Sequence, residues 1–179
     1  MKLKHSSKNN GLTLIEALIW FAIFAAVVAG IFALYSNARN ASNSSTVNKE
    51  LSTIFSQTEQ LFASEDTKDL DKALALKMGV FPKSVKVSSS GVISNVFGGT
   101  IEITGQTPSG FTVTYTGVPS GEVCSNIVRA QKAVGWDTVE GKALATYDST
   151  YSISQVGSVC GDNGGEVTDL VFIRLGSNT

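Results

Sequence analysis

Apolar positions follow two different patterns along this chain. Residues 12–35 are almost continuously apolar and contain one acidic or basic side chain, Glu16. Because a helix rises about 1.5 Å per residue, this run is long enough to span a bilayer core of about 30 Å. We therefore predict a membrane-spanning helix near the start of the chain.

A second helical pattern follows, with a polar face and an apolar face. Its apolar positions are Val47, Leu51, Ile54, Phe55, Thr58, Leu61 and Phe62, and its polar positions are Asn48, Lys49, Gln57, Glu59 and Gln60. This spacing predicts a half-buried amphipathic helix. The intervening Ser36–Thr46 is rich in Ser and Asn, which are weak helix formers. It is either a linker or the soft middle of one long helix, and we favour the continuous helix.

Beyond residue 65 the pattern becomes mixed, with short helices and alternating strands. A short helix is predicted over Asp69–Met78, stopped by Gly79, and a second begins at Ser120 as its N-cap, carries Cys124 in its first turn and runs to Gly135. Alternation begins at Val85 and Val87. It then predicts an antiparallel hairpin over Thr100–Thr104 and Phe111–Thr116, and further strands at Tyr151–Ser154 and Leu170–Leu175, the last central in its sheet.

The isolated acid in the apolar run needs an explanation. An acidic side chain at a bilayer centre costs about 2.5–3.5 kcal/mol on translocon-type scales, so Glu16 is a candidate functional residue that requires a partner. Lys2, Lys4, His5 and Lys8 precede Gly11. If the chain is cut after Gly11, Leu12 gains a free amine one helical turn before Glu16, on the same chain or on a neighbour.

The Gly11–Leu12 junction, Glu16 and the apolar helix together resemble the type IV prepilin signature. The resemblance implies cleavage between Gly11 and Leu12 by a prepilin peptidase, N-methylation of Leu12, and a role for Glu16 in registering subunits within a fibre. The leader is longer than in the type IVa class, and Leu12 replaces the phenylalanine usual there. Both differences point to the type IVb class.

The resemblance also implies a fold and a domain organisation. The fold expected is α+β, with a long N-terminal helical spine packed on an antiparallel sheet. Residues 1–11 would be the leader, 12–35 the transmembrane and filament-core helix, 36–64 the amphipathic half of the spine, and 65–179 the head domain. Two alternatives for the start, a cleaved secretory signal and a plain signal anchor, leave Glu16 unexplained.

Composition narrows the partners and the compartment. The net charge of −1 and the 16% of charged residues offer no basic surface for nucleic acid as the main ligand. Cys124 and Cys160 are an even pair in a chain that carries export features, which favours a disulfide over two free buried thiols. The resemblance implies that region 124–160 between them is variable and surface-forming.

Catalytic and metal-binding patterns are weak in this sequence. His5, in the expected leader, is the sole histidine, which argues against Ser-His-Asp and Cys-His catalysis and imidazole zinc sites in the processed chain. Asp162, Asn163, Glu166 and Asp169 do not have EF-hand spacing, and Asp66, Asp69 and Asp71 suit a helix start better than a glycosidase pair. We expect no enzyme, no metal and no cofactor.

The expected function is structural. The resemblance implies a major pilin subunit that polymerises with identical copies after storage in the inner membrane, handled by the prepilin peptidase and a pilus assembly machine. The fibre would serve adhesion, aggregation or conjugative mating-pair contact with a host or recipient cell. The alternatives are a minor pilin or tip adhesin and a type II secretion pseudopilin.

Overall fold

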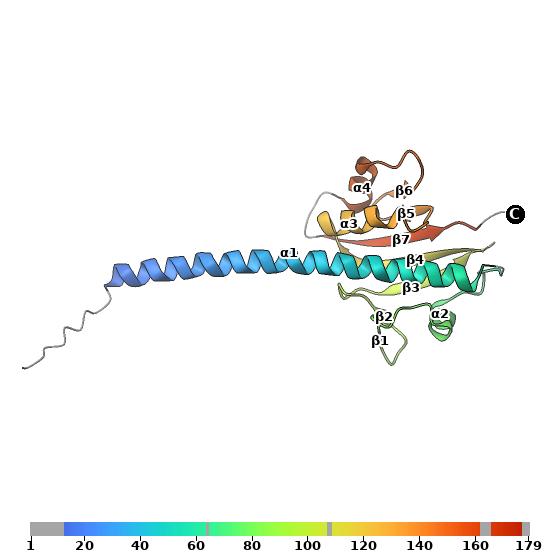
Figure 1. Cartoon of the computed structure of the whole chain (residues 1–179), viewed down its shortest axis with the longest axis horizontal. Helices are drawn as coiled ribbons and strands as arrows, with labels where there is room; N and C mark the ends of the chain where they lie inside the picture. Colours follow the sequence, from blue (N-terminus) through green and yellow to red (C-terminus); the bar gives the residue numbers. More distant parts are fainter. Residues whose placement is uncertain (1–12, 64, 107–108, 162–165, 177–179) are drawn as a thin grey trace, which may run out of the picture. The chain divides into compact units, whose positions relative to one another are not determined.

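The computed structural model describes residues 13–63, 65–106, 109–161 and 166–176. The chain divides into two compact units, residues 1–39 and 40–179. One helix, α1 (Leu14–Leu61), has 48 residues and contributes to both units (Figure 1). The prediction of a continuous helix is confirmed, and the alternative of a linker at Ser36–Thr46 is wrong.

Hydroxyl side chains explain how the serine-rich middle of α1 stays helical. Ser44 Oγ donates to the carbonyl of Asn40 at 2.9 Å, and Thr46 Oγ1 donates to the carbonyl of Ser42 at 3.1 Å. These side chains can compete with backbone hydrogen bonding in other conformations. Here each hydroxyl donates to the carbonyl four residues earlier, so its hydrogen bond is compatible with a continuous helix.

The second unit is built on a five-stranded antiparallel sheet in the order β3-β4-β7-β5-β6. Its strands are β3 (Ile101–Gln106), β4 (Gly110–Pro119), β5 (Thr138–Glu140), β6 (Leu144–Thr146) and β7 (Val167–Arg174). The predicted hairpin is confirmed as β3 and β4, in which Ile103 faces Val113. The prediction that the last strand is central is also confirmed, because β7 pairs with both β4 and β5.

Shorter elements surround this sheet. They are α2 (Lys72–Met78), the two-stranded sheet of β1 (Lys86–Val87) and β2 (Ile93–Ser94), α3 (Glu122–Gln131) and α4 (Ile153–Cys160). Figure 1 shows α2, β1 and β2 on the β3 side of the sheet and α3 and α4 on the β5–β6 side. The fold is therefore α+β, as expected.

Three helix boundaries differ from the sequence predictions. Helix α2 begins at Lys72 rather than Asp69, because Asp71 is its N-cap and accepts a hydrogen bond from Leu74 N at 2.7 Å. Its predicted stop is confirmed, since Gly79 adopts the left-handed conformation, with φ 73°. Helix α3 begins after Gly121 and ends at Gln131, so Ser120 is not its N-cap and Gly135 lies beyond its end.

The strand predicted at Tyr151–Ser154 is wrong. Ser152 is instead the N-cap of α4, and its backbone N–H is bonded by the side chain of Gln155, which completes a capping box. This reciprocal pairing satisfies two otherwise unpaired N–H groups at the helix start. The capping box therefore favours a helix here, because an alternating pattern of only four residues is a weak signal for a strand.

The core lies between the second half of α1 and the sheet. Val47, Leu51 and Ile54 are fully buried. Phe55 extends the contact, because its ring lies 4.8 Å from that of Trp136, centroid to centroid, in an edge arrangement. Apolar burial thus fixes the amphipathic half of the helix on the head.

Candidate assembly site

The side chains of the first half of α1 are not covered by other residues of the same unit. None of its large apolar side chains is buried: Val28 is partly exposed, and the exposed ones are Leu14, Ile15, Leu18, Ile19, Trp20, Phe21, Ile23, Phe24, Val27, Ile31, Phe32, Leu34 and Tyr35. An 18-residue window reaches a mean hydropathy of 2.6, and by length and composition α1 alone among the described residues could cross a membrane. A helix that is apolar all round requires cover from lipid or from other helices.

The start of α1 places Glu16 in its first turn. The Glu16 backbone N–H donates to Thr13 Oγ1 at 3.4 Å, so Thr13 occupies the N-cap position. No ion pair joins the Glu16 carboxylate to another described residue. Gly11 and Leu12, the predicted cleavage and methylation positions, lie outside the described residues, so the proposed amine–carboxylate pair stays a prediction.

Small residues are distributed through the same half-helix. Ala22, Ala25, Ala26, Ala29, Gly30 and Ala33 are all exposed. A Cβ added at Gly30 would meet nothing within 4 Å. Small side chains permit close approach of a second helix, which makes this surface suited to packing against copies of itself.

Polar contacts also fix the second half of α1 to the head. Trp136 Nε1 donates to Gln131 Oε1 at 3.0 Å, and Gln131 Nε2 donates in turn to Asn48 Oδ1 on α1 at 3.1 Å. Near the other end, Arg174 binds Glu59 of α1 at 3.0 Å and Asp137 at 2.8 Å. These bonds specify the position of the helix on the sheet, in addition to the apolar core.

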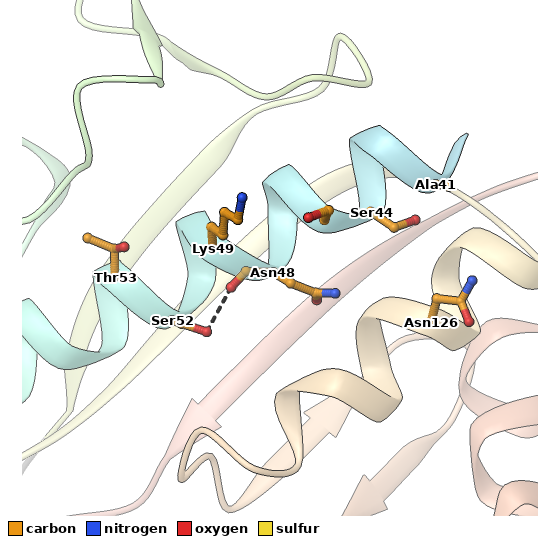
Figure 2. Close-up of a pocket in the computed structure, with 8 residues that line it drawn as sticks. Ala41, Ser44, Asn48, Lys49, Ser52, Thr53 and Asn126 are labelled. Carbon is orange, nitrogen blue, oxygen red and sulfur yellow. Dashed lines mark hydrogen bonds between the residues drawn. The ribbon is translucent and has the colours of Figure 1, made fainter. Parts of the chain in front are cut away.

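A shallow groove of about 620 Å³ runs beside α1, and Asn126 of α3 also lines it (Figure 2). Its other lining residues are Ala41, Ser44, Ser45, Asn48, Lys49, Ser52 and Thr53. Figure 2 shows Ser52 bonded to the backbone of Asn48, at 2.7 Å. The lining contains no carboxylate or imidazole that would serve as a general base. The groove therefore offers a packing surface and no catalytic constellation.

The two cysteines form a disulfide. Cys124, in the first turn of α3, is joined to Cys160, the last residue of α4, with a Cα–Cα separation of 5.7 Å. Both residues are fully buried. The bond connects α3 to α4 and closes a loop that contains β5 and β6, so it secures one edge of the sheet.

The acidic residues considered as calcium ligands either bond to other groups of the chain or lie outside the described residues. Asp162 and Asn163 lie outside the described residues. Glu166 forms an ion pair with Lys142, which lowers the pKa of that carboxyl. Asp169 Oδ1 accepts a hydrogen bond from Gly117 N at 2.8 Å. Within the part of the chain that the structure describes, no three His, Cys, Asp or Glu residues are grouped as a metal site.

One functional candidate, Glu50, was missed from the sequence. It is 2% exposed, although it is an acid. Its carboxylate accepts hydrogen bonds from Tyr115 Oη at 3.0 Å and from Ser84 Oγ at 3.3 Å. Burial raises the pKa of Glu50 against the lowering effect of both hydrogen bonds, and burial beside Glu50 raises the pKa of Tyr115. The available signal was its helical spacing from Val47 and Ile54, on the apolar face of α1.

Comparisons with known proteins agree with this architecture. The sequence model of the family described as PilS N terminal matches residues 41–174. Seven chains of known structure match, among them the type IVb pilin from Salmonella typhi, with 18% identity, a TM-score of 0.53, and cover of 74% of this chain and 97% of that one. No curated protein matches. Because the family model covers most of the chain and the fold agrees, this protein belongs to the PilS family of type IV pilins.

Proposed function

We propose that this chain is the major structural subunit of a type IVb-like pilus and that it polymerises through the first half of α1. The observation that carries the proposal is the division of α1. Its second half is built into the head through Val47, Leu51 and Ile54, whereas its first half buries none of its large apolar side chains. A pilin needs this arrangement, because the same surface must lie first in lipid and then among other helices.

The proposed pathway begins in the inner membrane, where the chain is a single-pass protein. A prepilin peptidase cuts between Gly11 and Leu12 and methylates the new amine. The assembly machinery then extracts the helix, and its apolar surface moves from lipid into a bundle of identical helices. Glu16 and the Leu12 amine of a neighbouring subunit neutralise one another there, which fixes the axial step between subunits.

The fibre is proposed to act at cell surfaces, in adhesion, aggregation or conjugative mating-pair contact. The disulfide-bounded region 124–160 contains most of α3 together with β5, β6 and α4 and would provide much of the outward surface. A minor pilin or tip adhesin and a type II secretion pseudopilin are the alternatives. The moderate size of the head, which carries no added domain within the described residues, favours the major subunit.

Mass spectrometry of fibres sheared from cells tests the identity of the subunit. The dominant chain should begin at methylated Leu12 and carry the Cys124–Cys160 bond. A minor pilin would be present as a small fraction of the fibre, and a pseudopilin would not dominate it. A fibre chain that retains residues 1–11, or that lacks α1, would refute the proposal.

Substitution of Glu16 tests the assembly step separately. Glu16→Ala should still insert in the membrane, because it removes a charge from an apolar helix, but it should yield no fibre. Glu122→Ala is the matched control, since Glu122 is an exposed acid in the first turn of α3. Normal fibre yield from Glu16→Ala would contradict the role proposed for this residue.

A further inference from the structure

The buried acid Glu50 lies beside a cavity that the assembly site described above does not use. This cavity has a volume of about 290 Å³ and is lined by Asn43, Glu50, Ser84, Lys86, Ser94, Asn95 and Val96. Helix α1 provides Asn43 and Glu50, and the segment around β1 and β2 provides the others. Glu50 therefore lines this cavity together with hydroxyl, amide and amine side chains.

Within the part of the chain that the structure describes, no cationic side chain forms an ion pair with this carboxylate. Tyr115 and Ser84 donate hydrogen bonds to it, but no ion pair joins Glu50 to any described residue. Lys86 lines the same cavity, yet its amine is not paired with Glu50. Removing a carboxylate from water without a cation is costly, and burial accordingly raises the pKa of Glu50. In the free chain the Glu50 carboxylate is therefore buried without a cationic partner among the described residues, and a cation from outside would stabilise its charged form.

From this cavity and its unpaired acid, we propose that Glu50 is a docking point for a lysine ammonium of a neighbouring copy of the chain. This inference rests on the proposed function, because a homopolymer presents identical copies at a fixed spacing. A slender alkyl-ammonium side chain suits a cavity with an acid at its wall and hydroxyl and amide groups around it.

The chain itself provides the complementary charge. Six exposed lysines have no ion pair within the described residues: Lys49, Lys68, Lys77, Lys83, Lys86 and Lys132. By contrast, Lys72 and Lys142 are paired with Glu102 and Glu166. A copy of this chain is therefore a donor of free ammonium groups, and the neighbouring subunit is always present in a fibre.

Glu50→Gln tests the docking point, because glutamine keeps the size and hydrogen-bonding capacity of the side chain and removes its charge. Purified fibres are heated in mild detergent, and the fraction of chain released as monomer is measured. We expect release at a fixed temperature to rise about tenfold, as for loss of a buried charge pair at an interface. The dispersed monomer should unfold no more readily than wild type. Glu122→Gln is the matched exposed control and should behave as wild type.

A second series identifies the lysine. Each described lysine is changed to glutamine, alone and together with Glu50→Gln, in a double-mutant cycle. One variant other than Lys86→Gln should reproduce the release, and the double variant should add nothing further.

The inference would be overturned if Glu50→Gln fibres released no more monomer than wild-type fibres. It would also be overturned if the effect of Glu50→Gln added to the effect of every lysine substitution. Coupling confined to Lys86 that is equally strong in the monomer would also overturn it, because the pair would then lie within one chain. Failure of the wild-type chain to form fibres would refute the proposed function itself, and this inference with it.

Discussion

Opening the Cys124–Cys160 disulfide should weaken the head by a predictable amount. The bond closes a loop with a sequence separation of 36 residues. On the chain-entropy model, a crosslink of that length stabilises the folded state by about 4 kcal/mol at 25 °C, through restriction of the unfolded chain. This is a large share of the 5–15 kcal/mol that stabilises a typical protein. We expect the reduced head to fold, but with a much smaller margin.

Fluorescence of Trp136 provides the assay. This residue is 2% exposed in the aromatic cluster, and the chain has one other tryptophan, Trp20, in the apolar half of α1. In a Trp20→Phe background, urea unfolding in detergent micelles therefore reports on the head alone. With a slope of about 2 kcal/mol per molar urea, the loss should lower the midpoint by about 2 M.

The reduced state must be prepared from unfolded protein, since both cysteines are fully buried. Cys124→Ala/Cys160→Ala is the control for the reductant and should not respond to it. A midpoint difference below about 0.5 M between oxidised and reduced wild type, equal to about 1 kcal/mol at that slope, would refute the reasoning.

Three further predictions concern the head, measured by the same unfolding assay except for Gly105→Ala, which is measured by the yield of soluble protein. Burial raises the pKa of Glu50 above its ordinary 4.5, so the wild-type head should lose stability as pH rises from about 4.5 through the higher pKa of the folded state. Glu50→Gln should remove that decline, and identical pH slopes for the two proteins would contradict the prediction. At Gly105 an added Cβ would lie 1.5 Å from the Thr67 carbonyl oxygen, so Gly105→Ala should not give a soluble folded head. At Gly157 in α4, an added Cβ would meet nothing within 4 Å, so Gly157→Ala should stabilise the head by about 0.5–1 kcal/mol. Equal behaviour of the two glycine variants would show the reasoning to be wrong. Leu51→Ala, at a fully buried position, should cost about 2–5 kcal/mol, and a cost below about 1 kcal/mol would mean that α1 is not held by its apolar face.

Local patterns predicted the elements whose signal is long and regular. The helical spacing from Val47 to Phe62 anticipated the face that α1 buries, and the alternation at Thr100–Thr104 and Phe111–Thr116 anticipated the β3–β4 hairpin. Both signals extend over several residues, and burial along a helix or strand repeats the same pattern. The four residues Tyr151–Ser154 are too few for this, and the Ser152–Gln155 capping box decided the helix there.

The sequence by itself determined that this chain has an apolar helix with one acid near its start, an amphipathic continuation and a strand-rich head, because hydrophobic periodicity is a property of neighbouring positions. Tertiary structure alone decided which charged side chains are buried and which are paired. The burial of Glu50 against Tyr115 of β4, and the bridging of Glu59 and Asp137 by Arg174, depend on residues far apart in the chain. Solvation and charge pairing are set by what folds against each side chain, and no local pattern records that.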